Sequence, residues 1–342
     1  MSTATHPATA AEQFARRRRS PVQRVQHLLH AHPAISPLLV LIVSFVVFSA
    51  INPRFAAPNS LSLVLQQVAV IGALAIGQTL IILTAGIDLS VGAIALLSMM
   101  VAAKFSAEQG LPAVLAILLG VVVGTAAGAL NGVLVTRVKL PPFIVTLGTL
   151  SIFTALGLLY TSGQSVQATD LPALLSWTGQ SFPLGPFSVT YGVVLVAVLY
   201  LVVGFVLAKT AWGRHVYAVG DDAEASRLAG IRVNRVLFSV YTTAGAIYGI
   251  TAWILIGRAG AASPNAIADA NLESITAVVI GGTSLFGGRG AVLGTLLGAL
   301  IVGFFRSGLS LAGVDDTYRV LAVGVLVILA VSVDQWIRKV RA

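Results

Sequence analysis

The sequence contains no cysteine, which excludes disulfide bonds and thiolate metal sites. Charge is also scarce, because only 10% of the 342 residues are charged and 57% are hydrophobic. A soluble domain is about 45–50% apolar, and it could not bury so many apolar side chains. Apolar runs of about 17–25 residues, the length that a bilayer requires, recur along almost the whole chain. The sequence therefore predicts an all-α, polytopic membrane protein.

Motifs for chemistry are missing too. The chain has no G-x-x-x-x-G-K-[ST] motif, so it cannot bind ATP through a P-loop of its own. Its apolar runs hold almost no Asp, Glu or His of the kind that relays protons or binds coupling ions, although sodium could still bind to backbone carbonyls. No HExxH motif or paired carboxylates occur at membrane depth. We expect no catalytic residue, no metal and no cofactor in this chain, and any ATP-driven work needs a partner.

The apolar runs predict about ten membrane spans. The eighth is short and contains Gly281-Gly282, so it could be re-entrant or broken. The expected spans are 35–51, 61–85, 89–105, 112–135, 142–161, 188–208, 236–256, 271–286, 291–308 and 319–337. The expected domain organisation is a basic cytoplasmic tail (1–34), a transmembrane domain (35–337) with a cytoplasmic loop at 209–235, and a short cytoplasmic end (338–342).

The basic residues predict the orientation. With both termini in the cytoplasm, 16 of the 21 Lys and Arg residues lie inside and five outside, as the positive-inside rule requires. This distribution also explains the net charge of +9 without nucleic acid. We expect a multi-pass membrane protein in this orientation. The outer arginines Arg54, Arg258, Arg306 and Arg319 either pair with a docking protein or snorkel to the membrane interface.

Glycines recur at every fourth position in several spans, which places them on one helix face and permits close packing. One stripe is Gly120, Gly124, Gly128 and Gly132, another is Gly290, Gly294 and Gly298, and a third is Gly245 with Gly249. Packing within one protomer is the favoured interpretation, and a dimer contact is the alternative.

One segment is densely charged. Residues 213–235, named the charged segment here, hold seven charged residues out of 23. Asp221 or Asp222 can cap a helix that has Glu224 in its first turn, Arg227 late and Gly230 just after its end. A helix of about two turns is marginal alone in water. It is either a simple loop helix or a structure held in a cleft of a soluble partner.

Four stretches, in chain order, resemble the permease subunits of ribose-type, binding-protein-dependent ABC importers. They are AGIDLSVGAI (85–94), LPPFIVTLGTL (140–150), the charged segment and AVVIGGTSLFGGRG (277–290). Within the charged segment, Gly213, Arg214, Tyr217, Gly220 and Gly230 fit the family pattern, whereas Asp221-Asp222 replaces the commoner Gly-Asn. Elementary physics explains parts of these motifs, since Asp88 and Ser90 can cap a span and Pro141-Pro142 suits a helix start.

The resemblance implies a permease subunit that carries a monosaccharide, such as a ribose-like pentose. It implies ABC ATPase subunits that bind ATP and Mg²⁺, a second permease subunit, identical or not, and an extracytoplasmic sugar-binding protein. The charged segment would couple to the ATPase. Polar and glycine residues that could line the pathway or its gate are Gln66, Gln67, Asn131, Thr146, Gly281, Gly282 and Thr283. Alternatives are a nucleoside, a branched-chain amino acid or a furanose-like signal as the solute, or a self-sufficient facilitator or channel.

Overall fold

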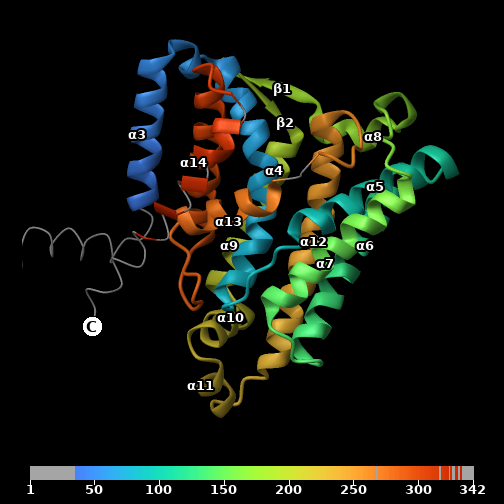
Figure 1. The fold of residues 1–342 in the computed structure, drawn as a ribbon, viewed down its shortest axis with the longest axis vertical. Helices are drawn as coiled ribbons and strands as arrows, with labels where there is room; N and C mark the ends of the chain where they lie inside the picture. The colour runs from blue at the N-terminus through green and yellow to red at the C-terminus, as the bar shows by residue number, and fades with distance from the viewer. Residues whose placement is uncertain are drawn as a thin grey trace, which may run out of the picture.

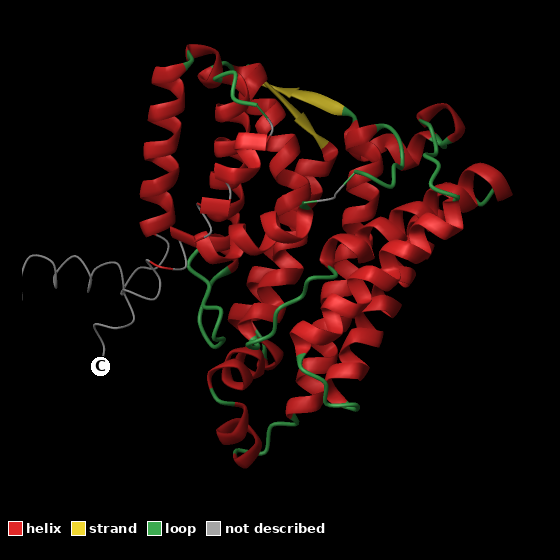
Figure 2. Ribbon diagram, in the orientation of Figure 1, coloured by secondary structure: helices red, strands yellow, loops and turns green. Residues whose placement is uncertain are grey.

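The computed structural model describes residues 35–266, 269–315 and, in part, 317–332 (317–322, 324–325, 328–329 and 332). The described chain is a bundle of helices with one small β-hairpin at an end (Figure 1; Figure 2). The predicted tails, 1–34 and 338–342, lie outside the described residues. So does much of the predicted last span, 319–337.

Nine of the predicted spans correspond to helices of the described chain. Seven of these are long and apolar enough to cross a membrane: α4 (Pro58–Leu83), α5 (Val91–Gln109), α6 (Ala113–Thr136), α7 (Pro142–Thr161), α9 (Tyr191–Lys209), α12 (Val233–Ala259) and α14 (Val292–Leu311). Two are shorter apolar helices, α3 (Ile35–Ile51) and α13 (Ala270–Ile280). The sequence left open whether the eighth span is re-entrant or broken, and in the structure its helix ends at Ile280, just before Gly281-Gly282.

The remaining elements are short and connect the long helices. They are η1 (Pro53–Ala56), η2 (Ala168–Asp170), α8 (Ala173–Ser176), η3 (Trp177–Gly179), β1 (Ser181–Leu184), β2 (Phe187–Thr190), α10 (Ala211–Asp221) and α11 (Ala223–Leu228). Strands β1 and β2 pair antiparallel, with Ser181 opposite Thr190. The hairpin lies at the end of the bundle away from α10 and α11 (Figure 1).

Burial divides the long helices into central and peripheral ones. In α4 and α12, 67% of the most apolar stretch is buried inside the protein, against 28% in α6, α7 and α9. The peripheral helices expose large apolar side chains such as Leu159 and Leu201. Such faces suit lipid, because a bilayer solvates apolar side chains as well as a protein core does.

The two glycine stripes of α6 and α12 pack against each other. A β-carbon placed at Gly124 would lie 2.5 Å from the carbonyl oxygen of Gly245 and 2.8 Å from the amide nitrogen of Gly249. At Gly128 it would overlap the carbonyl oxygen of Tyr241. The prediction of helix packing within one protomer is therefore confirmed, because the two backbones touch where only glycine fits.

The stripe predicted at 290, 294 and 298 is only partly a helix face. Helix α14 begins at Val292, so Gly290 lies before it, in a backbone conformation with φ of 148° that favours glycine. Gly294 and Gly298 do lie in the helix and pack against two carbonyl oxygens, those of Ala277 in α13 and of Gly281 just after its end. Glycines at every fourth position therefore do not show by themselves that all three belong to one helix.

Candidate functional site

The charged segment folds into two helices rather than one. Helix α10 begins after Thr210, whose hydroxyl accepts a hydrogen bond from the amide of Gly213 at 3.2 Å. Helix α11 begins after Asp222, whose carboxylate accepts hydrogen bonds from the amides of Glu224 and Ala225, both at 2.9 Å. The predicted capping role thus belongs to Asp222. Asp221 is the last residue of α10 and caps nothing, because the chain reaches extended geometry only at position 222.

Helix α11 is the exposed tip of this end of the bundle. Ser226 is its only buried residue, and Leu228 is 82% exposed. Glu224 and Arg227 form an exposed ion pair with each other at 2.5 Å. Gly230 follows with a positive φ of 86°, as predicted for the residue after a helix end. Coupling of this exposed helix to a soluble partner stays a prediction.

Helix α10 is packed firmly against the membrane domain. Its Tyr217 hydroxyl donates a hydrogen bond to the carbonyl oxygen of Gly290 at 3.0 Å, and burial raises the pKa of this tyrosine. A β-carbon at Gly220 would overlap the carbonyl oxygen of Leu83, the last residue of α4. Leu83 also accepts a hydrogen bond from the amide of Gly288 at 3.0 Å. The charged segment, the end of α4 and the loop 281–290 therefore meet at one place.

Near the same end of α4, the linker between α4 and α5 holds a buried polar cluster. Asp88 is fully buried and accepts hydrogen bonds from both the amide (2.7 Å) and the hydroxyl (2.6 Å) of Ser90. Asn131 of α6 donates to the Ser90 hydroxyl at 2.9 Å, and Thr146 of α7 donates to the carbonyl of Ile87 at 3.0 Å. These contacts tie α6 and α7 to the linker.

The expected capping of α5 by Asp88 and Ser90 needs correction. Ser90 does occupy the position before α5, but its side chain makes no capping hydrogen bond to the helix. Its hydroxyl is engaged by Asp88 and Asn131 instead. The amide of Gly92, in the first turn, donates a hydrogen bond to the side-chain oxygen of Asn271 in α13 at 2.8 Å. Tertiary contacts replace the local cap because the linker is buried inside the bundle.

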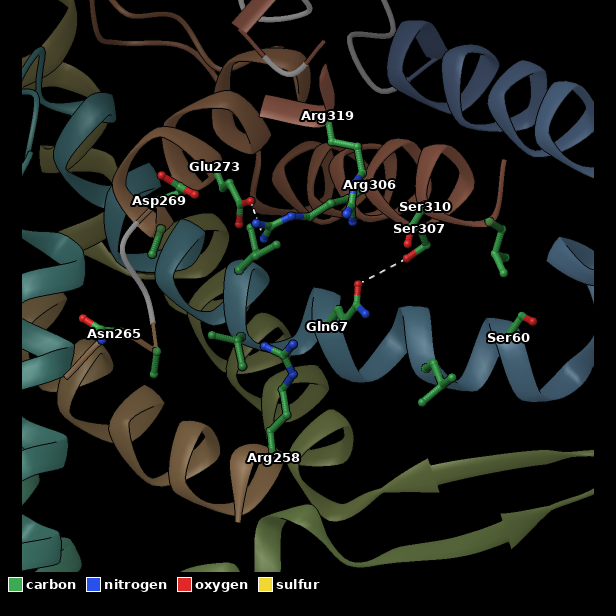
Figure 3. A pocket seen from close by; sticks show the side chains of 16 residues that line it. Ser60, Gln67, Arg258, Asn265, Asp269, Glu273, Arg306, Ser307, Ser310 and Arg319 are labelled. Carbon is green, nitrogen blue, oxygen red and sulfur yellow. Dashed lines mark hydrogen bonds and ion pairs between the residues drawn. The ribbon is translucent and has the colours of Figure 1, made fainter. Parts of the chain in front are cut away.

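The other half of the bundle contains a cavity of about 490 Å³. The first half of α4, the end of α12, the start of α13 and the end of α14 form its walls (Figure 3). Glu273 is 5% exposed and forms an ion pair with Arg306 at 2.5 Å. Gln67 accepts a hydrogen bond from the Ser307 hydroxyl at 3.2 Å. Donors and acceptors from four helices thus face one space.

Three of the four predicted outer arginines surround this cavity. Arg258 extends into it from the end of α12, and Arg306 and Arg319 lie on its opposite side (Figure 3). Arg54 lies apart from them in η1. Docking of a binding protein by these arginines stays a prediction. That three of these arginines line the same cavity could not be predicted from the sequence.

The predicted pathway residues are distributed among three places. Gln67 lines the cavity, whereas Gln66 is half-buried outside its lining. Asn131 and Thr146 bond the α4–α5 linker, as described above. Gly281 packs against Gly294, and the buried Thr283 lies beside Gly290. Gly282 has a positive φ of 84°, which allows the chain to turn after α13. Their role in a pathway stays a prediction.

Two features escaped the sequence analysis. The first is helix α10, which was not predicted although Thr210 is a typical N-cap residue. The Glu273–Arg306 pair had only a weak signal, opposite charges in consecutive spans, and nothing local fixes the partner. Among the described residues, no three His, Asp or Glu side chains are grouped so that they could hold a metal ion.

The seven long apolar helices define the class of the protein, which is a multi-pass membrane protein. The chain belongs to the family described as branched-chain amino acid transport system / permease component, whose model matches residues 60–331.

Curated relatives narrow this class. A fructose import permease protein of Rhizobium meliloti is 50% identical over 94% of this chain and 90% of its own. A ribose import permease protein of Bacillus subtilis is 38% identical, over 88% and 92%. A D-allose transport system permease protein of Escherichia coli is 33% identical, over 88% and 91%. No solved structure matches the chain significantly.

Proposed function

We propose that this chain is the permease subunit of a bacterial ABC importer and carries a monosaccharide across the inner membrane. The observation that carries the proposal is the exposed helix α11, capped by Asp222, at one end of a bundle whose sequence has no P-loop. Relatives that span about nine-tenths of the chain are named import permeases for fructose, ribose and D-allose. The 50% identity to the fructose permease favours fructose over a pentose.

The ATPase subunits dock at the α11 end in this proposal. ATP and Mg²⁺ bind to those subunits, and the permease itself makes and breaks no covalent bond. Helix α11 enters a cleft of the ATPase, and α10 transmits its displacement, because Gly220 touches α4 and Tyr217 bonds the loop 281–290. Rigid contacts of this kind pass on motion without dissipating it in side-chain rearrangement.

The proposed topology has ten spans with both termini in the cytoplasm. Helix α13 has only 11 residues, which is too short for a full crossing. The loop 281–290 that follows it continues to the α10 end of the bundle, and this supports counting helix and loop together as one span. Two permease subunits form the complete pathway, and a sugar-binding protein delivers the solute to the hairpin end. The exposed apolar faces of the peripheral helices contact lipid or the second subunit.

The test is reconstitution in proteoliposomes with the ATPase and the binding protein. We expect ATP-dependent uptake of radiolabelled fructose or ribose, and none when the ATPase carries an inactivated P-loop. Uptake without any ATPase would show a self-sufficient facilitator and overturn the proposal.

The second candidate is a permease for branched-chain amino acids, which the description of the matched family favours. Radiolabelled leucine in the same proteoliposomes separates the two. Leucine uptake that depends on ATP, with no sugar uptake, would establish this candidate instead.

A further inference from the structure

We infer that the cavity between α4, α12, α13 and α14 is a transit site for a neutral monosaccharide, entered from the hairpin end of the protein. This inference rests on the proposed function and deepens it, because it places a solute site within one subunit. It rests on the position of the cavity, on the polar groups that face it and on the way its wall connects to the charged segment.

The position is that of an entrance. The cavity lies along the first half of α4, whose last residue contacts α10 at the opposite end of the bundle. Near the mouth, the hydroxyl of Ser62 in α4 accepts a hydrogen bond from the amide of Ser188 in the hairpin at 3.0 Å. Asn265, Asp269 and Ser310 are exposed, whereas Glu273 is buried. The cavity is thus open at the hairpin end and closed beneath.

The size and the chemistry fit a polyhydroxylated solute. Small-molecule sites have volumes of about 300–1,000 Å³, and this cavity falls within that range. A sugar presents hydroxyl groups that both donate and accept. Guanidinium groups offer paired donors, carboxylates accept, and the amide of Gln67 does both. Arg258 and Arg306 face the cavity from opposite sides, so a ring between them can be bonded at both edges.

The charges are nearly balanced, which favours a neutral solute. Arg306 is already neutralised by Glu273, and the lining also holds a second carboxylate, Asp269, with the cations Arg258 and Arg319. A site that binds an anionic solute is expected to contain several cationic side chains that no carboxylate neutralises. Polar, nearly neutral surroundings bind a sugar weakly, and weak binding suits a solute that has to leave again.

The wall of the cavity is connected to the charged segment. Glu273 lies in the first turn of α13, and the helix runs about 10 Å from Glu273 to Ile280 at about 1.5 Å per residue. The loop that follows bonds both Tyr217 and Leu83 through Gly290 and Gly288. A displacement of α10 therefore reaches the Glu273–Arg306 pair through one short helix.

The absence of cysteine makes a direct test possible. A single thiol is introduced by Ser307→Cys in the cavity, with Gln67→Cys as a second reporter. The control is Gln164→Cys, in an exposed loop at the same end, beside the bridge of Val166 with Ala262. The permease–ATPase complex in nanodiscs is labelled with a membrane-impermeant maleimide, with or without excess fructose, ribose, sucrose or leucine.

We expect fructose or ribose to slow labelling at positions 307 and 67 but not at 164. At a concentration of about twice Kd, two-thirds occupancy slows the reaction about threefold. Sucrose and leucine should have no effect. Equal slowing at all three positions, no slowing at either cavity position, or no labelling of either cavity thiol would overturn the inference. Protection by leucine instead would reassign the solute class.

A functional arm uses Gln67→Ala with Gln164→Ala as the matched control. We expect at least a fivefold loss of sugar uptake for the first variant only, with ATPase copurification unchanged. Wild-type complexes that transport sugar without thiol protection would refute the cavity assignment alone. Wild-type complexes that transport no sugar would refute the proposed function.

Discussion

The contact between α6 and α12 gives a prediction whose size follows from the structure. A methyl group added by Gly128→Ala would overlap the carbonyl oxygen of Tyr241 and lie 2.9 Å from the α-carbon of Gly245. Both are backbone atoms, so no side chain can turn away, and the two helices must separate. Overpacking of this kind costs about 1–3 kcal/mol. The better helix propensity of alanine offsets about 1 kcal/mol at most.

The assay is equilibrium unfolding in mixed detergent micelles. We expect the free energy of unfolding to fall by about 2 kcal/mol for Gly128→Ala, because overlap with backbone atoms places the cost at the upper end of that range and helix propensity offsets about 1 kcal/mol. Gly148→Ala in α7 is the matched control, since a β-carbon there meets nothing within 4 Å, and its stability should stay equal or rise.

A double variant sharpens this test. Gly245→Ala opposes Gly128 across the same seam, so one separation of the helices accommodates both methyl groups. The double variant should therefore lose less stability than the sum of the two single ones. Strict additivity, or a stable Gly128→Ala variant, would refute the reasoning from backbone contact.

Three further predictions concern the two ends of the bundle. Glu273→Gln keeps a hydrogen-bond acceptor but removes the charge that neutralises Arg306, and the free energy of unfolding should fall by about 1–3 kcal/mol, less than for a fully buried pair because Arg306 is 35% exposed. Asp222→Ala removes the cap of α11, costs about 1 kcal/mol of helix stability and should lower ATP-dependent uptake; Asp221→Ala should not. Gly220→Ala moves α10 off Leu83, so uptake should be lost although the ATPase still hydrolyses ATP.

Much of the fold was predictable because its signals are local. The length of an apolar run determines whether a helix can span a bilayer, and Asp222 caps α11 through amides two and three residues away. The glycine stripes predicted close packing, and α6 and α12 supply both sides of it. Each signal needs no knowledge of distant partners.

The candidate site was not predictable to the same extent, because its groups come together only in three dimensions. In the sequence Asp88 is a possible cap for a span, yet in the structure it is buried in a linker that is bonded by α6 and α7. Arg258 and Arg306 are 48 positions apart and share a cavity. Opposite charges predict an ion pair only when the neighbours are known.

Several helices connect the two ends of the bundle, and the kind of contact each makes limits how one end can act on the other. Helix α4 lines the cavity with Gln67 and touches α10 with Leu83. Helix α13 runs parallel to that link, from Glu273 to the loop that bonds Tyr217. The α6–α12 contact, by contrast, is backbone against backbone and cannot slide without breaking. In the proposed mechanism, motion that starts at α11 reaches the cavity through α4 and α13. Helix α12 also joins the two ends, because Ser239 accepts a hydrogen bond from Trp212 of α10 and Arg258 lines the cavity, but α12 moves only together with α6.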